Sequence, residues 1–201
     1  VYFGGTEFSL RTAADNFTPE QMQEGLEFAH AHGVKCYCAV NIFPRNAQVE
    51  RMGDYFRQLQ DLGVDAVIVS DLGAFFEAKR AAPGLPIHVS TQANNVNYKA
   101  VAAWAELGAA RVVLARELSF DEIRTIREKV PGVELECFVH GAMCISFSGR
   151  CLLSNYMAGR DSNQGACAHP CRWKYALVEE KRPGEFMEIG EDQNGTFLLN
   201  S

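Results

Sequence analysis

The sequence predicts an α/β fold in which short apolar strands alternate with amphipathic helices. Short apolar runs recur at a spacing of roughly 25 to 30 residues, each run is followed by helical periodicity, and glycine or Pro-Gly turns close most repeats. Alternation of this kind indicates parallel strands joined by right-handed crossovers. Because no G-x-G-x-x-G follows the first strand, we expect a (β/α)8 TIM-barrel-like fold rather than an open doubly wound sheet.

The helices carry recognisable start and stop signals. The first has Thr18 as its N-cap, Pro19 at its first position and Gln21 as the third residue after the cap, and Ser119 with Glu122 forms a second capping box. Glycines or Pro-Gly pairs end the helices. The predicted strands cover 1–5, 35–43, 65–70, 86–90, 111–115 and 133–139, and the predicted helices cover 19–32, 47–62, 72–82, 95–107 and 119–130.

The chain divides into three predicted parts. Residues 1–140 form the barrel repeats, 141–175 a cysteine-rich loop, and 176–201 a small appendage of antiparallel strands joined by turns. The chain opens and closes in apolar sequence, so we expect the barrel to be truncated at its first and last strands. A truncated barrel exposes a sheet edge, and we expect such a segment to be inactive alone.

Composition narrows the class of protein. The chain has 201 residues, of which 47% are hydrophobic and 22% charged, as in an ordinary globular protein. It has no apolar run long enough to cross a bilayer and no signal peptide, so we expect a cytoplasmic protein without a membrane partner. The net charge of −6 argues against indiscriminate binding of nucleic acid but leaves room for a local basic site.

The seven cysteines fall into two groups. An odd number without a secretory signal argues against a disulfide framework. Cys36, Cys38 and Cys137 lie inside predicted strands, where a cysteine usually behaves as a small buried hydrophobe. The other four lie in glycine-rich sequence, in the pattern Cys144-x6-Cys151-x15-Cys167-x3-Cys171.

This second group indicates a bound metal. The spacing between the first two cysteines is too wide for a zinc knuckle, whereas an iron–sulfur cluster needs only four converging thiolates. We therefore favour an iron–sulfur cluster, with zinc and structural or redox thiols as alternatives. His169, between the last two cysteines, is a possible substitute ligand.

Polar side chains follow the predicted strands and are candidates for a site at the barrel mouth. The carboxyl ends of barrel strands meet at one face, where barrel enzymes hold their substrates. Glu136 and His140 alternate along the sixth strand and share a face, although a salt-bridged structural role for Glu136 is the competing interpretation. The candidate substrate or catalytic residues are Asn41, Asp71, Gln92, Glu117, Glu136 and His140.

Other hydrolytic signatures are scarce. The sequence contains neither H-E-x-x-H nor G-x-S-x-G, and the serines near His140 have no spacing that specifies a triad. Cys144 near His140 is a possible nucleophile and base, but a cluster ligand explains the same cysteine better.

Basic and aromatic residues flank the four cysteines. Such interleaving suits an unstacked base held beside phosphates, while a solvated loop with aromatic anchors is the alternative. The candidate RNA-binding residues are Arg150, Arg160, Arg172, Trp173 and Lys174.

Several motifs resemble the family named peptidase U32, once called collagenase-like, over nearly the whole chain. The most specific lie in the cysteine loop, and shorter ones lie upstream. They are Glu136-x-Phe-x-x-Gly141-Ala-x-Cys144, Ser148-Gly-Arg-Cys151-Leu-Leu-Ser154, Gly159-Arg-Asp-x-Asn-Gln-Gly-Ala-Cys167, Cys171-Arg-Trp-Lys-Tyr175, Ser9-Leu-Arg11, Asn41, Ser70-Asp71, His88-x-Ser-x-Gln-Ala93 and Ala115-Arg-Glu-Leu118.

The resemblance implies an activity as well as a fold. Its R-D-x-N-Q-G and C-R-W-K-Y elements are similar to the branch that makes 5-hydroxyuridine at the wobble position of tRNA, with prephenate rather than oxygen as the hydroxyl donor. It implies a 4Fe-4S cluster on Cys144, Cys151 and Cys167, with Cys171 or a cysteine beyond residue 201 as the fourth ligand. The alternatives are a U32 peptidase or a hydroxylation accessory protein.

Overall fold

The structure, a computed structural model, describes residues 1–10, 16–141, 144–188, 190–192 and 195–197. Arg11, Ala142 and the last residues of the predicted appendage lie outside these ranges. The chain forms two compact units, 1–168 and 169–201, so the boundary falls inside the predicted cysteine loop. The elements of the first unit, in order, are β1 (Tyr2–Gly4), α1 (Pro19–Ala31), β2 (Tyr37–Val40), α2 (Asn46–Asp61), β3 (Ala66–Val69), α3 (Leu72–Ala81), β4 (Ile87–Val89), η1 (Thr91–Ala93), α4 (Tyr98–Leu107), β5 (Arg111–Val113), α5 (Phe120–Lys129), β6 (Glu134–Glu136), α6 (Leu153–Ala158) and η2 (Ser162–Gln164).

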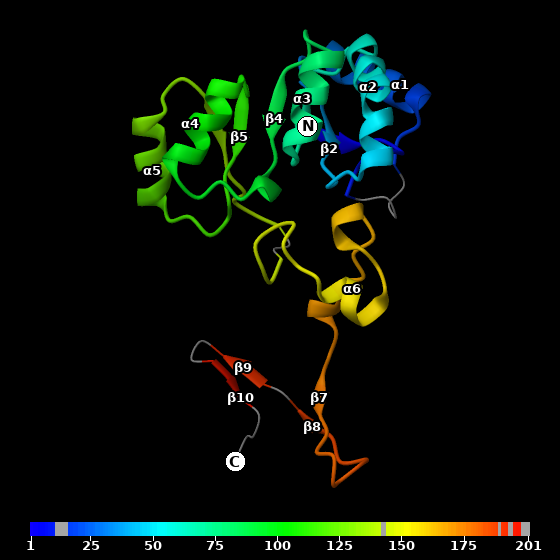
Figure 1. Ribbon diagram of the computed structural model, residues 1–201, viewed down its shortest axis with the longest axis vertical. Helices are drawn as coiled ribbons and strands as arrows, with labels where there is room; N and C mark the ends of the chain where they lie inside the picture. The colour runs from blue at the N-terminus through cyan, green and yellow to red at the C-terminus, as the bar shows by residue number, and fades with distance from the viewer. Residues whose placement is uncertain (11–15, 142–143, 189, 193–194, 198–201) are drawn as a thin grey trace. The chain divides into compact units, whose positions relative to one another are not determined.

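The six strands of the first unit form one parallel sheet in sequence order, β1-β2-β3-β4-β5-β6 (Figure 1). A helix follows each of the first five strands, which confirms the predicted alternation. The register is continuous: Tyr37 of β2 pairs with Tyr2 on one side and Ala66 on the other. The result is the α/β architecture of a truncated barrel, in which the ends of neighbouring strands lie side by side.

Two capping boxes predicted from the sequence are present. Thr18 accepts from the amide of Gln21 and begins α1, and Ser119 does the same with Glu122 at α5. One helix begins later than predicted. The expected helix from residue 95 starts at Tyr98, because the Asn97 side chain accepts from the amide of Ala100 at 3.0 Å and so caps the helix there.

The sixth strand is shorter than predicted. It ends at Glu136, which pairs with Val113, the last residue of β5, so the ladder has no partner left for the residues that follow. Cys137 is consequently exposed rather than buried in a strand, and His140 lies in exposed coil. The expectation that Glu136 and His140 share a strand face was therefore wrong.

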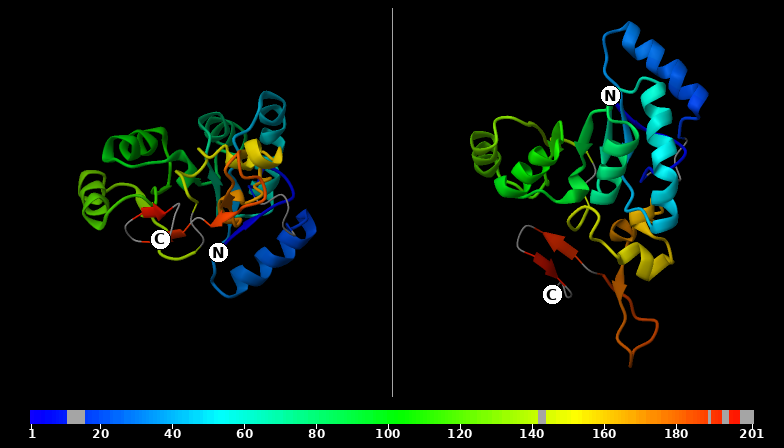
Figure 2. Two further views of the ribbon diagram at one scale, coloured as in Figure 1. Left: turned by 90° about the horizontal axis from the view of Figure 1, so that it is seen from below. Right: turned by 45° about the horizontal axis from the view of Figure 1, so that its top comes forward.

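The hydrophobic core lies between the sheet and its helices. Alternate strand residues such as Val67, Val89 and Val112 are fully buried, and they meet the buried side chains of Phe56 and Phe75 from α2 and α3. Burial of this kind is the main favourable contribution to folding. Figure 2 shows the helices flanking the strands from two further directions.

Cys36 and Cys38 belong to this core, as predicted. Their exposed fractions are 3% and 0%. Burial raises the pKa of the Cys38 thiol to about 12, so this cysteine stays protonated in the core.

Strand residues on the other face of the sheet are more polar. Arg111 of β5 forms ion pairs with Glu134 at 2.6 Å and Glu136 at 3.0 Å, and its guanidinium lies 5.1 Å from the ring centre of Tyr37. Tyr37, Arg111 and Glu134, together with His88, line an open cavity of about 330 Å³. Burial and the nearby Arg111 charge lower the pKa of His88 to about 4, so its imidazole is neutral at physiological pH.

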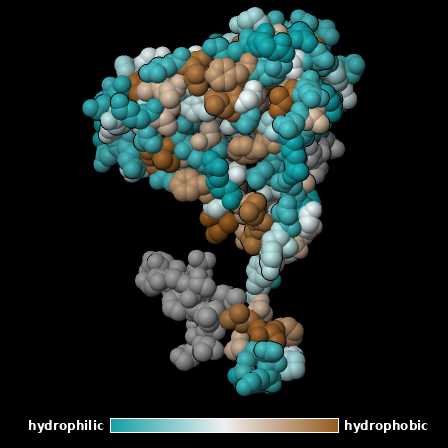
Figure 3. Space-filling model, viewed as in Figure 1, coloured by the Kyte–Doolittle hydropathy of each residue, from teal (hydrophilic) through white to brown (hydrophobic). Residues whose placement is uncertain are grey.

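The second unit contains η3 (Pro170–Arg172), β7 (Ala176–Leu177), β8 (Met187–Glu188), β9 (Gly190–Asp192) and β10 (Gly195–Phe197). β7 pairs with β8 and β9 with β10, both antiparallel, as expected for the appendage. Figure 3 shows hydrophilic side chains over much of the visible face of the first unit, with apolar ones among them. Within the described residues, no helix is both long and apolar enough to cross a membrane.

Candidate functional site

A buried hydrogen-bond network joins the carboxyl ends of three neighbouring strands. Asn41, Ser70 and Ser90 are the first residues after β2, β3 and β4. All three converge on the side-chain oxygen of Gln92, which is 5% exposed: the Asn41 amide donates at 3.1 Å, the Ser70 hydroxyl at 3.0 Å, and the Ser90 hydroxyl also donates to it. The network therefore fixes the mouth of the sheet, where the sequence predicted a site.

The cysteine loop is attached to this mouth between Cys144 and Cys151. The Asn94 side chain donates to the Ser148 carbonyl at 2.9 Å, and the Arg116 guanidinium donates to the Ser148 hydroxyl at 2.7 Å. Next to it, Gly149 has a positive φ of 71°, and a Cβ there would lie 2.5 Å from the ring of Phe43. Glycine at this position lets the loop backbone approach the mouth closely.

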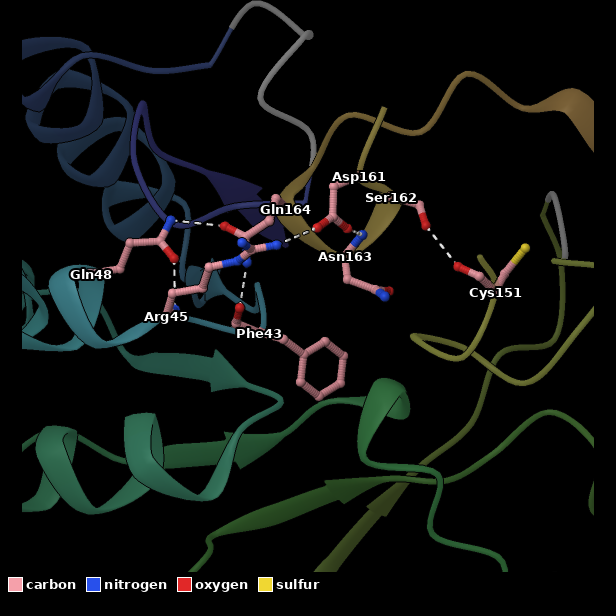
Figure 4. Close-up of polar contacts among 8 residues, drawn as sticks. All are labelled: Phe43, Arg45, Gln48, Cys151, Asp161, Ser162, Asn163 and Gln164. Carbon is pink, nitrogen blue, oxygen red and sulfur yellow. Dashed lines mark hydrogen bonds and ion pairs between the residues drawn. The ribbon is translucent and has the colours of Figure 1, made fainter. Parts of the chain in front are cut away.

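A second attachment lies between Cys151 and Cys167 (Figure 4). The loop after β2 presents both backbone groups of Phe43: its amide donates to the Asn163 carbonyl at 3.2 Å, and its carbonyl accepts from the Gln164 side chain. Gln48 donates to the Gln164 side-chain oxygen at 2.8 Å. Arg45 forms an ion pair with Asp161 at 3.1 Å.

Between the two attachments the loop forms a short helix, α6, in a region predicted to be irregular. Ser154 of α6 is 1% exposed, and its hydroxyl accepts from the Ala168 amide at 2.9 Å, which joins the helix to the residue after Cys167. Ser148 is 8% exposed and bonded to Arg116, so neither serine is available as an exposed nucleophile.

The four loop cysteines differ in placement. Cys144 is exposed, Cys151 and Cys167 are half-buried, and Cys171 is exposed in the second unit. No disulfide joins any of the seven cysteines, all of which lie in the described ranges. The Cys151 sulfur accepts a hydrogen bond from the Leu153 amide at 3.4 Å. Among the described residues, no three His, Cys, Asp or Glu side chains form a metal-binding group.

The chemistry of these donors fits a thiolate-bound metal. All four are cysteines outside disulfides, and a backbone amide already donates to one sulfur, which is the kind of contact that tunes iron–sulfur clusters. Large apolar residues, Ile145 and Leu152, directly follow the first two cysteines. The donor set is therefore of the right kind for a cluster.

The other predicted mouth residues have separate environments. The Asp71 carboxylate accepts from the Ala74 amide at 2.9 Å and caps α3. Glu136 is paired with Arg111, which is the salt-bridged arrangement considered as the alternative to a substrate role. Glu117 and His140 are exposed. The structure thus brings Asn41 and Gln92 together and leaves the other four apart from that network.

The predicted RNA-binding residues are all exposed. Arg150 and Arg160 lie in the first unit, where the Arg160 side chain also donates to the Ala166 carbonyl at 2.9 Å. Trp173 follows η3 and is 46% exposed, and its neighbours Arg172 and Lys174 are exposed too. The indole ring of Trp173, which lies in sequence between the cations Arg172 and Lys174, is therefore exposed to solvent.

Sequence reasoning placed Arg116 among the polar residues that follow the strands. It missed the contacts that attach the loop, namely those of Asn94 and Arg116 with Ser148 and that of Gln164 with Phe43. Asn94 has a positive φ of 54°, a conformation that asparagine adopts more readily than most residues, but sequence alone does not reveal it.

Comparison with known proteins identifies the family. The family model for peptidase family U32 matches residues 1–201. The chain is 47% identical over 192 residues to tRNA hydroxylation protein P1 of Bacillus subtilis (strain 168), covering 96% of this chain and 45% of that protein. It is 39% identical over 240 residues to tRNA hydroxylation protein P of Escherichia coli (strain K12), covering 100% of this chain and 53% of that protein.

A solved structure supports the fold. The U32 peptidase Mk0906 aligns with a TM-score of 0.55 at 21% identity, covering 68% of this chain and 58% of that one. The chain spans about half the length of the curated relatives it matches. The motif resemblance noted in the sequence is confirmed by these matches: the chain belongs to peptidase family U32.

Proposed function

We propose that this chain is part of an RNA-modifying enzyme that hydroxylates carbon 5 of the wobble uridine in tRNA without molecular oxygen. The observation that carries the proposal is the 47% identity to a tRNA hydroxylation protein across 96% of the chain. A tRNA substrate places the reaction in the cytoplasm. Prephenate, the donor implied by the sequence motifs, supplies the hydroxyl group.

The cysteine loop holds a 4Fe-4S cluster in this proposal, with Cys144, Cys151, Cys167 and Cys171 as ligands. Their thiol chemistry and the amide contact to Cys151 support the assignment. When bound, such a cluster supplies redox or Lewis-acid chemistry. The chain's own contribution is to hold the loop at the barrel mouth, where the Asn41 and Gln92 side chains are hydrogen-bonded to each other. The candidate groups for contact with the substrate are Asp71, Glu117, Glu136 and His140.

Exposed cations and an aromatic ring hold the RNA in this proposal. Arg172, Trp173 and Lys174 are exposed and lie in sequence beside Cys171, and Arg150 and Arg160 are exposed in the first unit. Guanidinium and ammonium groups neutralise phosphates, and an indole ring stacks on an unpaired base. Replacing Arg172 and Lys174 with Gln is expected to weaken tRNA binding and flatten its dependence on salt. Replacement of Lys181, an exposed cation of the same unit, is the matched control.

Nucleoside mass spectrometry tests the activity directly. tRNA from cells that lack the gene is analysed after complementation with the full-length wild type, Cys151→Ala or Cys137→Ala. Cys137 is an exposed cysteine outside the proposed ligand set and is the matched control. We expect 5-hydroxyuridine with the wild type and with Cys137→Ala, and none with Cys151→Ala. Normal hydroxyuridine in cells that lack the gene, or in Cys151→Ala, contradicts the proposal.

A peptidase is the second candidate, because the family and one solved structure similar to this chain carry that name. The burial and bonding of Ser148 and Ser154 weigh against a serine nucleophile, which leaves Cys144 with His140 as the pair to test. Hydrolysis of gelatin or unfolded peptide by iron-depleted protein, abolished in Cys144→Ala, supports this candidate. Absence of cleavage removes it.

A further inference from the structure

The second attachment of the cysteine loop joins residues 116 to 121 positions apart in the chain, and the proposed function assigns no role to its individual residues. We infer that Phe43–Gln48, the docking edge, positions the span between Cys151 and Cys167, and that Gln164 is the central positioning residue. The inference rests on the proposed function only in taking these two cysteines as ligands of one metal group.

The side-chain amide of Gln164 is satisfied at both ends by the docking edge. Its nitrogen donates to the Phe43 carbonyl and its oxygen accepts from Gln48 at 2.8 Å. Gln48 is itself fixed, because its oxygen accepts from the Arg45 amide at 2.8 Å and so closes the first turn of α2. One glutamine of the barrel therefore both begins a helix and holds the loop.

The docked turn is ordered internally. Asp161 caps it by accepting from the Asn163 amide at 2.9 Å, and its carbonyl accepts from the amides of Gln164 at 3.2 Å and Ala166 at 3.0 Å. Gly165, with a positive φ of 89°, turns the chain out of η2. Residues 161–166 are therefore held in a turn by their own hydrogen bonds as well as by the docking edge.

The docked turn is tied to both cysteines that flank it. The Ser162 hydroxyl donates to the carbonyl of Cys151 at 3.0 Å, while the cysteine's sulfur points away from this contact (Figure 4). On the other side, Ala166 is held by Asp161 and by Arg160, and the next residue is Cys167. Displacing Gln164 from the docking edge thus releases the backbone at Cys151 and Cys167 together.

The contacts of the docking edge differ in strength. The Arg45 side chain is 77% exposed, so water and salt weaken its ion pair with Asp161. The Gln164 contacts are partly buried and involve the backbone of Phe43. We therefore assign the positioning to Gln164 and a minor part to the ion pair.

Limited trypsin digestion of the metal-free full chain tests the docking edge, with cleavage after Arg160 as the signal. Gln164→Met keeps the side-chain length and removes the polar contacts. Its matched control is Gln60→Met, since Gln60 also accepts from a backbone amide, that of Gly84 at 3.1 Å, at the far end of α2. We expect cleavage on the order of tenfold faster in Gln164→Met, and within about twofold of wild type in Gln60→Met and Arg45→Gln.

Iron retention after anaerobic loading supplies the second readout, measured as the rate of iron loss to a chelator. We expect Gln164→Met to load the wild-type amount of iron and to lose it several-fold faster, with Gln60→Met unchanged. Unchanged cleavage after Arg160 overturns the docking edge. Faster cleavage with wild-type iron retention overturns the positioning of the ligands. If the wild type binds no iron, the proposed cluster fails, and the digestion alone still decides whether the edge orders this span.

Discussion

Gln92 offers the sharpest test of the barrel mouth, because one buried oxygen receives three hydrogen bonds. The change to test is Gln92→Met, which keeps the length of the side chain and removes the acceptor. In this variant the Ser70 hydroxyl can still donate to the Asn41 backbone carbonyl at 3.0 Å. The Asn41 side-chain amide and the Ser90 hydroxyl lose their acceptor, the Gln92 oxygen.

Each buried donor left unpaired costs about 1–3 kcal/mol, so two of them predict a loss of about 3 kcal/mol in the free energy of unfolding. Urea unfolding followed by circular dichroism measures this value. Gln60→Met, at a surface glutamine with one hydrogen bond, is the control and is expected to lose less than about 1 kcal/mol.

A double variant separates the orphaned donor from a loss of packing. Ser90→Ala in the Gln92→Met background removes one donor that lacks a partner, so the double variant is expected to be more stable than the sum of the two single changes by about 1 kcal/mol. A Gln92→Met protein within about 0.5 kcal/mol of wild type would refute the reasoning, since the network would then carry no stability.

Three further predictions concern other parts of the chain. The folded pKa of His88, about 4, lies below its unfolded value of about 6.5, so stability present above about pH 6.5 is lost as the pH falls towards 4. Linkage gives at most about 2 kcal/mol between about pH 7.5 and about pH 5, measured by urea unfolding at each pH. His88→Gln should flatten that profile, and an unchanged profile in this variant would contradict the prediction. Gly149→Ala places a methyl group against the Phe43 ring at a position with a positive φ. We expect the free energy of unfolding to fall by about 1–3 kcal/mol and trypsin to cleave faster after Arg150. Wild-type stability and cleavage would contradict the close approach of the loop to Phe43. Ser119→Ala removes the cap of α5 and should lower the unfolding free energy by about 1 kcal/mol in thermal melts, with Ser119→Asp close to wild type.

Local signals determined much of the fold. Thr18 and Ser119 begin their helices as predicted because capping is a contact between neighbours in sequence. Parallel order followed from the alternation of elements. The errors arose where a distant or competing partner decides: β6 ends where β5 ends, and Asn97 caps α4 in place of an earlier residue.

The candidate site was predictable in part for the same reason. Residues in the short segments that follow parallel strands meet at one edge, which is how Asn41 and Gln92 were found. The contacts of Phe43 with Gln164 depend on how a loop folds back over more than a hundred residues, and no periodicity or spacing in the chain encodes that path. The proposed cluster ligands stay a prediction from their spacing and family motif.

The short helix α6 lies between two stretches of the loop that are each bonded to the barrel mouth. Residues 148 and 149 are held on one side and 161 to 164 on the other, while Tyr156 of α6 is 89% exposed. Ser154 on the same helix is buried and bonded to the Ala168 amide, so only the exposed face of α6 is open to change. A fluorophore attached at Tyr156 would therefore report on the loop while both flanks and the buried face of the helix stay in place.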